Sequence, residues 1–332
     1  MTDIPSGVPR PYPRRAVVTG AAGFIGSHIA QALLRRGATV IGVDHRDVSC
    51  DPLAAANLGT HGELDGYLHV TADLRTCAIE PLLLDADAVF HLAGLPGVHP
   101  SWGPQFAEYV HTNIVATQRL MEAAIRVRVP RVVVASSSSV YGATAGGASA
   151  ETDLPQPISP YGVSKLAQEQ LCLAHATRTD CPTSVVALRY FTVYGPRQRP
   201  DMFIHRVLTA ALTGQPLRLF GQGHQRRDFT YIDDVTEATI AAGVAPANAI
   251  AVNIGGGTDV SLIDVINMVK ALTGREIQLH ADLARHGDAP TTRADTRRAE
   301  SVLSWRPAVD LLTGMRAQLQ ALAQQPAYNG AA

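Results

Sequence analysis

The sequence predicts an α/β fold in which a parallel sheet is covered by helices on both faces. Short apolar runs alternate with longer amphipathic segments up to about residue 191 of the 332-residue chain. The apolar runs are continuous, which is typical of strands that are buried on both faces. A strand followed by a helix, repeated along the chain, indicates that the strands are parallel.

The expected elements follow one another from the N-terminus. The first strand, AVVTG (16–20), leads into a helical stretch that closes at Gly37. The other strands expected in this part are TVIGVD (39–44), YLHVTAD (67–73), ADAVFHLAG (86–94), RVVVASSSS (131–139) and TSVVALRYF (183–191), with helices at about 105–126 and 161–178.

Beyond residue 191 the alternation loosens, and a strand and a helix return at AVNIGGG and SLIDVINMVKALTG. In that helix Ser261 and Asp264 fit a capping box, and Gly274 fits a C-terminal stop. We therefore expect a large doubly wound domain at 14–191 with a return segment at about 231–270. A smaller, interleaved C-terminal α/β domain is expected at 192–230 and 271–325.

Composition excludes several classes of protein. The net charge is -1, with 46% hydrophobic and 17% charged residues, and no basic stripe or polybasic run favours nucleic acid or a membrane surface as partner. No apolar run is long enough to span a bilayer. The start, MTDIPSGVPRPYPRR, has no apolar core and predicts a loose leader and not a signal peptide.

The metal-ligating and redox-active residue types are scattered. The four cysteines, Cys50, Cys77, Cys172 and Cys181, stand apart without CxxC spacing, which predicts free thiols in a reducing, cytoplasmic compartment. The twelve histidines show no HxxxH or similar spacing, so we expect no metal site.

A glycine-rich turn follows the first strand. TGAAGFIGSH places Gly20, Gly23 and Gly26 between strand and helix, where they let the backbone approach a pyrophosphate at the helix N-terminus. The second strand ends at Asp44, which can accept hydrogen bonds from both hydroxyls of an adenosine ribose. A merely tight turn is the alternative, but the pairing with Asp44 predicts a Rossmann-type, NAD-binding first domain.

Charge near the ribose bears on the choice of dinucleotide. Asp44 repels a 2′-phosphate, which favours NAD over NADP, and Arg46 could soften that preference. Asp73 and Leu74, after the third strand, suit the adenine edge, although a solvated aspartate at a strand end is an ordinary alternative.

A tyrosine and a lysine lie four residues apart at the start of a predicted helix. Tyr161 and Lys165 would lie on one face, one turn apart. The strand 131–139 brings four serines to the carboxyl end of the sheet, where such folds hold their ligands. An ammonium and an oxidised nicotinamide both favour phenolate, so we expect a lowered tyrosine pKa and a proton-transfer unit for oxidising an alcohol.

With these motifs in this order, the sequence resembles the extended short-chain dehydrogenase/reductases, in their nucleotide-sugar epimerase/dehydratase group. The resemblance extends from TGAAGFIGSH to about RADTRRAESVLSW. It implies catalytic roles for Ser137, Tyr161 and Lys165. Besides Arg46, Tyr161 and Lys165, the cofactor-contact positions are Gly20, Gly23, Phe24, Ile25, Gly26, Asp44, Asp73, Leu74, Leu92, Ala93, Asn113, Ser136, Tyr190 and Val193. Leu92 and Ala93 could equally be packing, and Asn113 a polar helix residue.

The second half of the chain resembles segments that close over a nucleoside diphosphate. By this resemblance Arg199 and Arg227 pair with the diphosphate, and Asp288 accepts from the uridine ribose. Taken alone, Arg226 and Arg227 would be a solvated turn, and the run 293–298 a charged helix start.

The segments LPGVHPSWGPQFAEYVHTNIVATQRLMEAA and RYFTVYGPRQRPDM resemble bacterial UDP-glucuronate 4-epimerases. The positions matching Ser138 and Thr192 bind the sugar carboxylate in such relatives, and Ser139 joins this substrate-binding set. His99 stands where those relatives carry arginine. A histidine can be neutral at pH 7, and an ordinary loop histidine is the alternative reading.

The resemblance implies an isomerase that inverts C4 of a UDP-sugar through a transient 4-keto sugar, with UDP-glucuronate and UDP-galacturonate as the favoured pair. The alternatives are a UDP-glucose/UDP-galactose 4-epimerase, then a UDP-glucuronate decarboxylase or a dehydratase. Both of the latter lack their acids, because Ser138 and Ser139 stand at those positions. A non-catalytic NAD-binding sensor is ranked last. Related proteins also imply a homodimer paired through the helices at 105–126 and 161–178.

Overall fold

The computed structural model describes residues 12–59, 61, 64–143, 146–283 and 286–325. Of the predicted leader MTDIPSGVPRPYPRR, residues 1–11 lie outside the described residues, and its last residue, Arg15, begins the first strand. Its centre is a seven-stranded sheet in the order β11-β6-β5-β4-β1-β2-β3, in which every paired neighbour is parallel. The strands are β1 (Arg15–Thr19), β2 (Thr39–Asp44), β3 (Tyr67–Thr71), β4 (Ala88–His91), β5 (Arg131–Ser137), β6 (Ser184–Tyr190) and β11 (Ile250–Ile254). The predicted fold class is confirmed.

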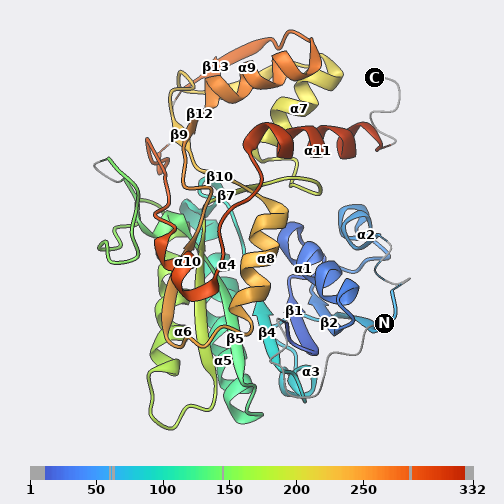
Figure 1. Cartoon of the computed structure of the whole chain (residues 1–332), viewed down its shortest axis with the longest axis vertical. Coiled ribbons are helices and arrows are strands. Elements are labelled where there is room, and N and C mark those ends of the chain that lie inside the picture. The colour runs from blue at the N-terminus through green and yellow to red at the C-terminus, as the bar shows by residue number, and fades with distance from the viewer. Residues whose placement is uncertain (1–11, 60, 62–63, 144–145, 284–285, 326–332) are drawn as a thin grey trace.

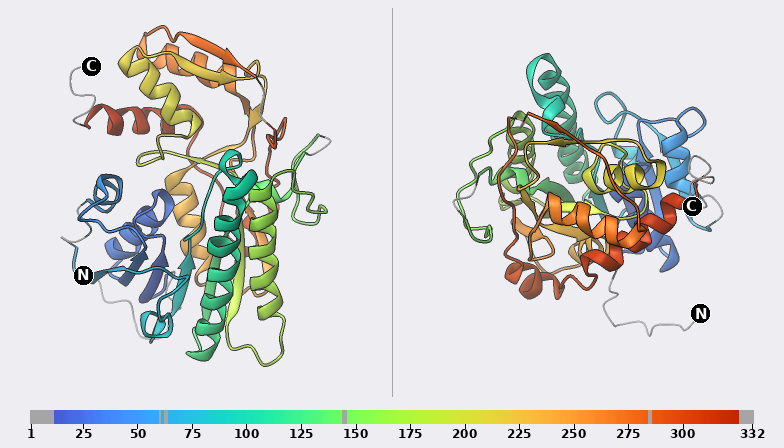
Figure 2. Two further views of the ribbon diagram at one scale, coloured as in Figure 1. Left: turned by 180° about the vertical axis from the view of Figure 1, so that it is seen from behind. Right: turned by 90° about the horizontal axis from the view of Figure 1, so that it is seen from above.

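Helices cover both faces of this sheet (Figures 1 and 2). On one face α1 (Phe24–Arg35) packs against α8 (Ile232–Ala242). On the other face α5 (Ala116–Arg126) lies beside α6 (Pro160–Ala176), and α5 is preceded by α4 (Phe106–Tyr109) and a π-helical turn, η4 (Val110–Val115). The shorter helices α2 (Pro52–Leu58), α3 (Glu80–Leu83) and α10 (Arg297–Leu303) complete the layers.

The central strands are buried because both faces are covered. All seven residues of β5 are buried, and separate apolar clusters form on the two sides of the sheet. Continuous apolar strands rather than alternating ones follow from this double burial. Within the described residues, no helix combines the length and the apolar character that crossing a membrane requires.

A smaller unit sits beyond the carboxyl ends of the strands, at the top of Figure 1. It contains α7 (Phe203–Thr213), α9 (Leu262–Thr273) and α11 (Leu311–Ala323), which contact one another. It also contains the parallel pair of β8 (Leu217–Phe220) and β13 (Leu279–Asp282). Two pairs of short strands connect the two units: β7 (Thr192–Tyr194) pairs with β10 (Phe229–Tyr231), and β9 (Arg226–Arg227) pairs with β12 (Val260–Ser261).

The return segment to the large domain was expected to extend to about residue 270, but the helix within it, α9, packs against the smaller unit. The returning strand β11 belongs to the central sheet and ends at Ile254, whereas α9 packs against α7 and α11. Helix α10 contacts β11 and α8, so residues 297–303 lie with the large sheet. The apolar face of α9 suits either unit, so its pattern alone does not assign the helix to one of them.

The predicted caps of α9 are present. The Ser261 hydroxyl accepts a hydrogen bond from the Asp264 amide at 3.1 Å, and Gly274 ends the helix with a φ of 67°. That left-handed conformation favours glycine.

Candidate active site

The glycine turn after β1 has no room for side chains. Gly20 has a φ of +68°, and a β-carbon there would lie 2.9 Å from the Ala93 amide nitrogen. A β-carbon on Gly26 would lie 2.2 Å from the Gly20 carbonyl oxygen. Helix α1 begins without a side-chain cap or an acidic residue in its first turn. Free amides at a positively polarised helix end, with close backbone approach, fit the pyrophosphate of a dinucleotide.

Asp44 lies at the end of β2, facing this turn. It is 5% exposed and accepts hydrogen bonds from the Ala22 amide (3.0 Å) and from the Arg46 side chain (3.2 Å). Burial alone would raise the pKa of Asp44, but the hydrogen bonds and charge of Arg46 outweigh it and lower the pKa. The carboxylate is therefore ionised, as an acceptor for ribose hydroxyls must be.

Lys165 is held on α6 by buried polar groups. Its ammonium, in a side chain only 6% exposed, donates to the Ala135 carbonyl oxygen and to Gln168 Oε1, both at 2.5 Å. Gln168 in turn donates to the Thr117 hydroxyl at 2.9 Å. Burial lowers the pKa of Lys165 to about 8. An ammonium has three donors, so one remains for a ligand.

The same network reaches the glycine turn through His91. Thr117 donates to the Asn113 carbonyl at 2.7 Å, so its oxygen accepts from His91 Nε2 at 2.9 Å. His91 Nδ1 then accepts from the Thr19 hydroxyl at 2.8 Å. Burial lowers the pKa of His91 to about 3. A neutral imidazole thus links the end of β1 to the lysine.

Tyr161 is placed by the start of α6. Ser159 caps the helix by accepting from the Gly162 amide at 3.1 Å. The Tyr161 amide donates to the Ser101 hydroxyl at 3.0 Å, and Ser101 donates to the Val98 carbonyl at 2.6 Å. This places the phenol beside Ser137 at the end of β5, and the two side chains form a hydrogen bond.

The pKa of Tyr161 differs from the expectation. Burial raises the pKa of the phenol, and this outweighs the opposing effects of the Ser137 hydrogen bond and the Arg199 charge. We expected the Lys165 ammonium to lower the pKa of Tyr161. Among the protein's own groups it does not, because the ammonium points to Ala135 and Gln168. The protein cation that favours phenolate is Arg199.

A buried ion pair between α6 and β6 also binds the serine strand, β5. Glu169 is 0% exposed, and its carboxylate accepts two bonds from Arg189, at 3.0 and 2.6 Å. The Ser136 hydroxyl donates to the same carboxylate at 2.6 Å. The Arg189 guanidinium also donates to the Tyr141 hydroxyl at 2.8 Å and lies over its ring. Helix α6 is thereby fastened to β5 and β6.

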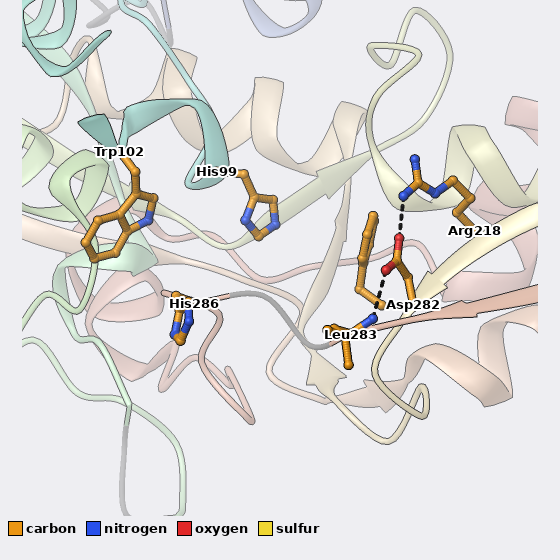
Figure 3. A pocket seen from close by; sticks show the side chains of 7 residues that line it. His99, Trp102, Arg218, Asp282, Leu283 and His286 are labelled. Atoms are coloured by element: carbon orange, nitrogen blue, oxygen red, sulfur yellow. Dashed lines mark hydrogen bonds and ion pairs between the residues drawn. The ribbon is translucent and has the colours of Figure 1, made fainter. Parts of the chain in front are cut away.

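Beyond the serine strand, an open cavity of about 730 Å³ lies between the loop at 98–102 and the pair β8–β13 (Figure 3). His99 and Trp102 line one side, and Phe220 and the ion-paired Arg218 and Asp282 line the other. Leu283 and His286 also line it. The aromatic and charged lining suits a base and a phosphorylated sugar.

Arg227 and Asp288, both predicted to bind the substrate, lie close enough for their charges to interact. The Arg227 guanidinium donates to the Ala289 carbonyl at 2.7 Å. Burial lowers the pKa of Arg227, and the charge of Asp288 opposes this. Asp288 also lies 3.6 Å from His99, measured between its Oδ2 and Nε2. Arg226 instead pairs with Asp259 on the surface.

The remaining residues predicted to bind the substrate, and several predicted to contact the cofactor, are placed as follows. Arg199 pairs with Asp201 at 2.9 and 2.5 Å. Thr192 opens β7, and Ser138 and Ser139 form a short 3-10 turn, η5 (Ser138–Val140), directly after Ser137. The predicted cofactor positions Phe24, Ile25, Leu92, Ala93 and Val193 lie on or next to β1, α1, β4 and β7.

Several predicted cofactor positions have their polar groups engaged within the protein. Ser136 donates to Glu169, and the Tyr190 hydroxyl bonds to Thr239 at 2.8 Å. The Asn113 amide bonds to both backbone groups of Leu95 and to Ser164. Asp73 pairs with Arg75, while Leu74 is buried.

The sequence interpretation missed Ser101, Glu169 and Arg189. Arg189 carried a usable signal, because a charged residue within the apolar strand TSVVALRYF predicts a buried partner. Glu169 lies one helical turn after Lys165 and was interpreted only as continuing the helix. Ser101 lies 60 residues from the amide it binds, and no local pattern marks it.

The fold and this site define an NAD-binding α/β protein with a tyrosine-lysine pair at the carboxyl edge of its sheet. The model of the NAD dependent epimerase/dehydratase family matches residues 16–255. The chain belongs to this family.

The chain is similar to several named proteins over nearly its whole length. The Bacillus subtilis (strain 168) protein named "Uncharacterized UDP-glucose epimerase YtcB" is 41% identical over 305 residues, covering 91% of this chain and 95% of the relative. The UDP-glucuronic acid 4-epimerase of Bacillus cereus, solved with UDP-glucuronic acid and NAD, is 40% identical, with a TM-score of 0.88 and coverage of 93% and 99%. MoeE5, solved with NAD and either UDP-glucuronic acid or UDP-glucose, is 45% identical, with TM-scores of 0.86 and 0.87 and the same coverage.

Proposed function

We propose that this protein is an NAD-dependent 4-epimerase that interconverts UDP-glucuronate and UDP-galacturonate. The observation that carries the proposal is the hydrogen bond between Ser137 and the Tyr161 phenol, at the sheet edge shared with the glycine turn. The similarity to a UDP-glucuronic acid 4-epimerase that binds this substrate and NAD supports the choice of sugar.

Each catalytic residue has one task in this proposal. Tyr161 removes the proton from the C4 hydroxyl and later returns it. Ser137 accepts from the Ser139 amide at 3.1 Å, which leaves its own hydrogen for the phenolate or the substrate oxygen. Bound NAD supplies the acceptor and the donor for the C4 hydride. Lys165 directs its remaining N–H to the cofactor ribose and its positive charge to the site.

The cofactor positions divide between the two ends of a dinucleotide. The amides at the start of α1 and the glycines before it hold the pyrophosphate, and Asp44 holds the adenosine ribose. Positions whose side chains are engaged elsewhere, such as Ser136 and Tyr190, contribute through backbone or packing.

The sugar carboxylate is assigned to Ser138 and Thr192. These hydroxyls orient a carboxylate without the permanent charge of a lysine or arginine, and neither Ser138 nor Ser139 can act as the acid that dehydratases and decarboxylases carry there. Oxidised at C4, a glucuronate is a β-keto acid that loses CO2 most easily when the breaking bond is perpendicular to the carbonyl plane. Both hydroxyls hold the carboxylate away from that geometry.

A second candidate function is the interconversion of UDP-glucose and UDP-galactose. The name of the Bacillus subtilis relative and the binding of both UDP-glucose and UDP-glucuronic acid by MoeE5 favour it. A histidine at position 99 is also compatible with a neutral sugar.

We further propose a large NAD-binding domain and a smaller nucleotide-sugar domain, with the boundary after β11 instead of at residue 270. A homodimer paired through α5 and α6 is supported by Val115 and Val163, which are 41% and 46% exposed on this helical layer. A cytoplasmic location is supported by the unpaired state of all four cysteines.

The test is to incubate the purified protein with UDP-glucuronate, without added NAD, and to follow the sugar protons by NMR. UDP-galacturonate without pentose is the expected result, and it also requires the cofactor to be retained. A UDP-pentose product would show decarboxylation. Turnover of UDP-glucose alone would establish the second candidate, and no turnover of either sugar after NAD is added would refute an epimerase.

A further inference from the structure

We propose that His99 is a positioning residue that holds Asp288 beside the cavity and couples the position of residues 287 and 288 to the placement of Tyr161. The inference rests on the proposed function for its substrate class. It assigns to His99 a task that acts through Asp288 and not through the sugar carboxylate.

His99 meets the opposite side of the cavity at two points. Its Nε2 lies 3.6 Å from Asp288 Oδ2, and the two side chains are 34% and 29% exposed. Its ring centroid lies 6.4 Å from that of Phe220, the last residue of β8. The short helix η2 (His99–Ser101) therefore contacts both the β8–β13 pair and the chain that follows it.

The residue before Asp288 packs directly onto the same loop. Gly287 has a φ of +86°, and a β-carbon there would lie 3.0 Å from Val98 Cγ1, 3.3 Å from Ser159 Cβ and 3.4 Å from Trp102 Nε1. A glycine is needed for both the backbone conformation and the close approach. Residues 287 and 288 thus rest on the loop of His99 and on the cap of α6.

The loop of His99 is also fastened to the catalytic tyrosine. Ser101, at the end of η2, accepts the Tyr161 amide at 3.0 Å and donates to the Val98 carbonyl at 2.6 Å. The ring of Tyr109 meets that of Tyr161 edge-on at 6.2 Å, and its hydroxyl lies 3.0 Å from the Gly97 carbonyl oxygen. A movement of η2 is therefore transmitted to the start of α6.

The charges around the pair make it dependent on pH. Asp288 lies between His99 and Arg227, whose charges interact with it, and the ion-paired Arg218 and Asp282 face His99 across the cavity with His286. Arginine stays charged, whereas histidine ordinarily changes charge between about pH 5 and 8. Protonated His99 attracts Asp288 and holds it against the loop at 98–102. Neutral His99 loses that attraction as pH rises.

The probe is UDP alone, which lacks a sugar carboxylate. Its terminal phosphate loses a proton at about pH 6, so the wild type and the variants are compared with one another at each pH. By calorimetry we expect the Kd of UDP for His99→Gln to be about fivefold higher than for the wild type at pH 5.5, the scale of one partly exposed ion pair. At pH 8, where a histidine is ordinarily neutral, these two Kd values should converge, whereas His99→Arg should keep the lower Kd at both pH values. His280→Gln, which alters an exposed histidine on β13, is the control and should match the wild type.

Two further measurements separate the alternatives. Asp288→Asn and His99→Gln should have less than additive effects in the double variant, since either change breaks the same pair. For the UDP-sugar, His99→Gln should raise KM more than it lowers kcat. Unchanged UDP binding in His99→Gln, with a raised KM only for UDP-glucuronate, would overturn the inference and assign His99 to the carboxylate. If the His99 variants change the Kd of UDP as predicted but the protein turns over no UDP-sugar, the proposed function is refuted. The role of His99 in holding Asp288 would then still stand.

Discussion

Gly162 approaches the backbone of Ser139 so closely that a β-carbon at position 162 would lie 2.6 Å from the Ser139 carbonyl oxygen. The same β-carbon would lie 2.9 Å from Pro157 Cβ. Because Gly162 follows Tyr161 and Ser139 lies two residues after Ser137, this contact brings the start of α6 against the end of the serine strand. The hydrogen bond between the two catalytic hydroxyls depends on it.

Gly162→Ala should therefore separate Tyr161 from Ser137. Relieving a contact of 2.6 Å requires a shift of the helix start or of η5, and overpacking of this kind costs about 1–3 kcal/mol. We expect kcat to fall at least about tenfold, since misplaced catalytic groups lose rate steeply. Ala174→Ser, on the exposed face of the same helix, is the control. Full activity in Gly162→Ala would show that the contact does not position the tyrosine.

Tyr161→Phe should abolish turnover while the fold is kept. The variant retains the ring but lacks the proton acceptor, and loss of a general acid-base group costs about 10²–10⁴ in rate. Thermal unfolding should change little, because the phenol bonds to Ser137 and not to the network around Lys165. A variant with more than a tenth of wild-type kcat would assign proton transfer to another group.

Glu169→Gln, which breaks a buried ion pair, should destabilise the protein more strongly than Glu276→Gln, which breaks an exposed one. Arg189, 3% exposed, would be left without its counter-charge, which typically costs about 3–5 kcal/mol. The control is Glu276→Gln, which breaks the exposed Lys270–Glu276 pair at 2.6 Å and should cost at most about 1 kcal/mol. Equal effects in chemical denaturation would mean that the buried pair is not a support for α6.

Lys165 should make stability depend on pH in an alkaline window. Its folded pKa of about 8 lies below its usual 10.5, so between these values the unfolded chain binds more protons than the folded protein. The free energy of unfolding therefore rises with pH across this window, by up to about 3 kcal/mol. Lys165→Met removes this contribution, and the difference between wild type and variant, measured by denaturation from pH 7.5 to 10, should change accordingly. A constant difference would contradict the lowered pKa.

Much of the fold followed from local patterns. The continuous apolar strands, the glycine turn at 20–26 and the caps of α9 are determined by residues close in sequence, and all were predicted. The assignment of α9 to one unit or the other depends on which apolar surface it meets, and that information is not local. For the same reason the local pattern does not fix a domain boundary near residue 270.

The candidate site divides in the same way. Tyr161, Lys165 and Asp44 belong to short motifs with a recognisable spacing. Ser101 and Gly162 act through contacts with residues that lie elsewhere in the chain, so neither carries a local signal. The direction of the Lys165 ammonium depends on Ala135 and Gln168, which explains why its effect on Tyr161 was overestimated.

The central claim is that C4 of the sugar loses its hydrogen and regains it within one closed site. UDP-glucuronate deuterated at C4 tests this most directly, with the product analysed by NMR and mass spectrometry in ordinary water. The account predicts UDP-galacturonate that retains deuterium at C4, because the hydrogen leaves and returns without exchange with solvent. Epimerised product that has lost the deuterium would contradict the return of the same C4 hydride from the bound cofactor.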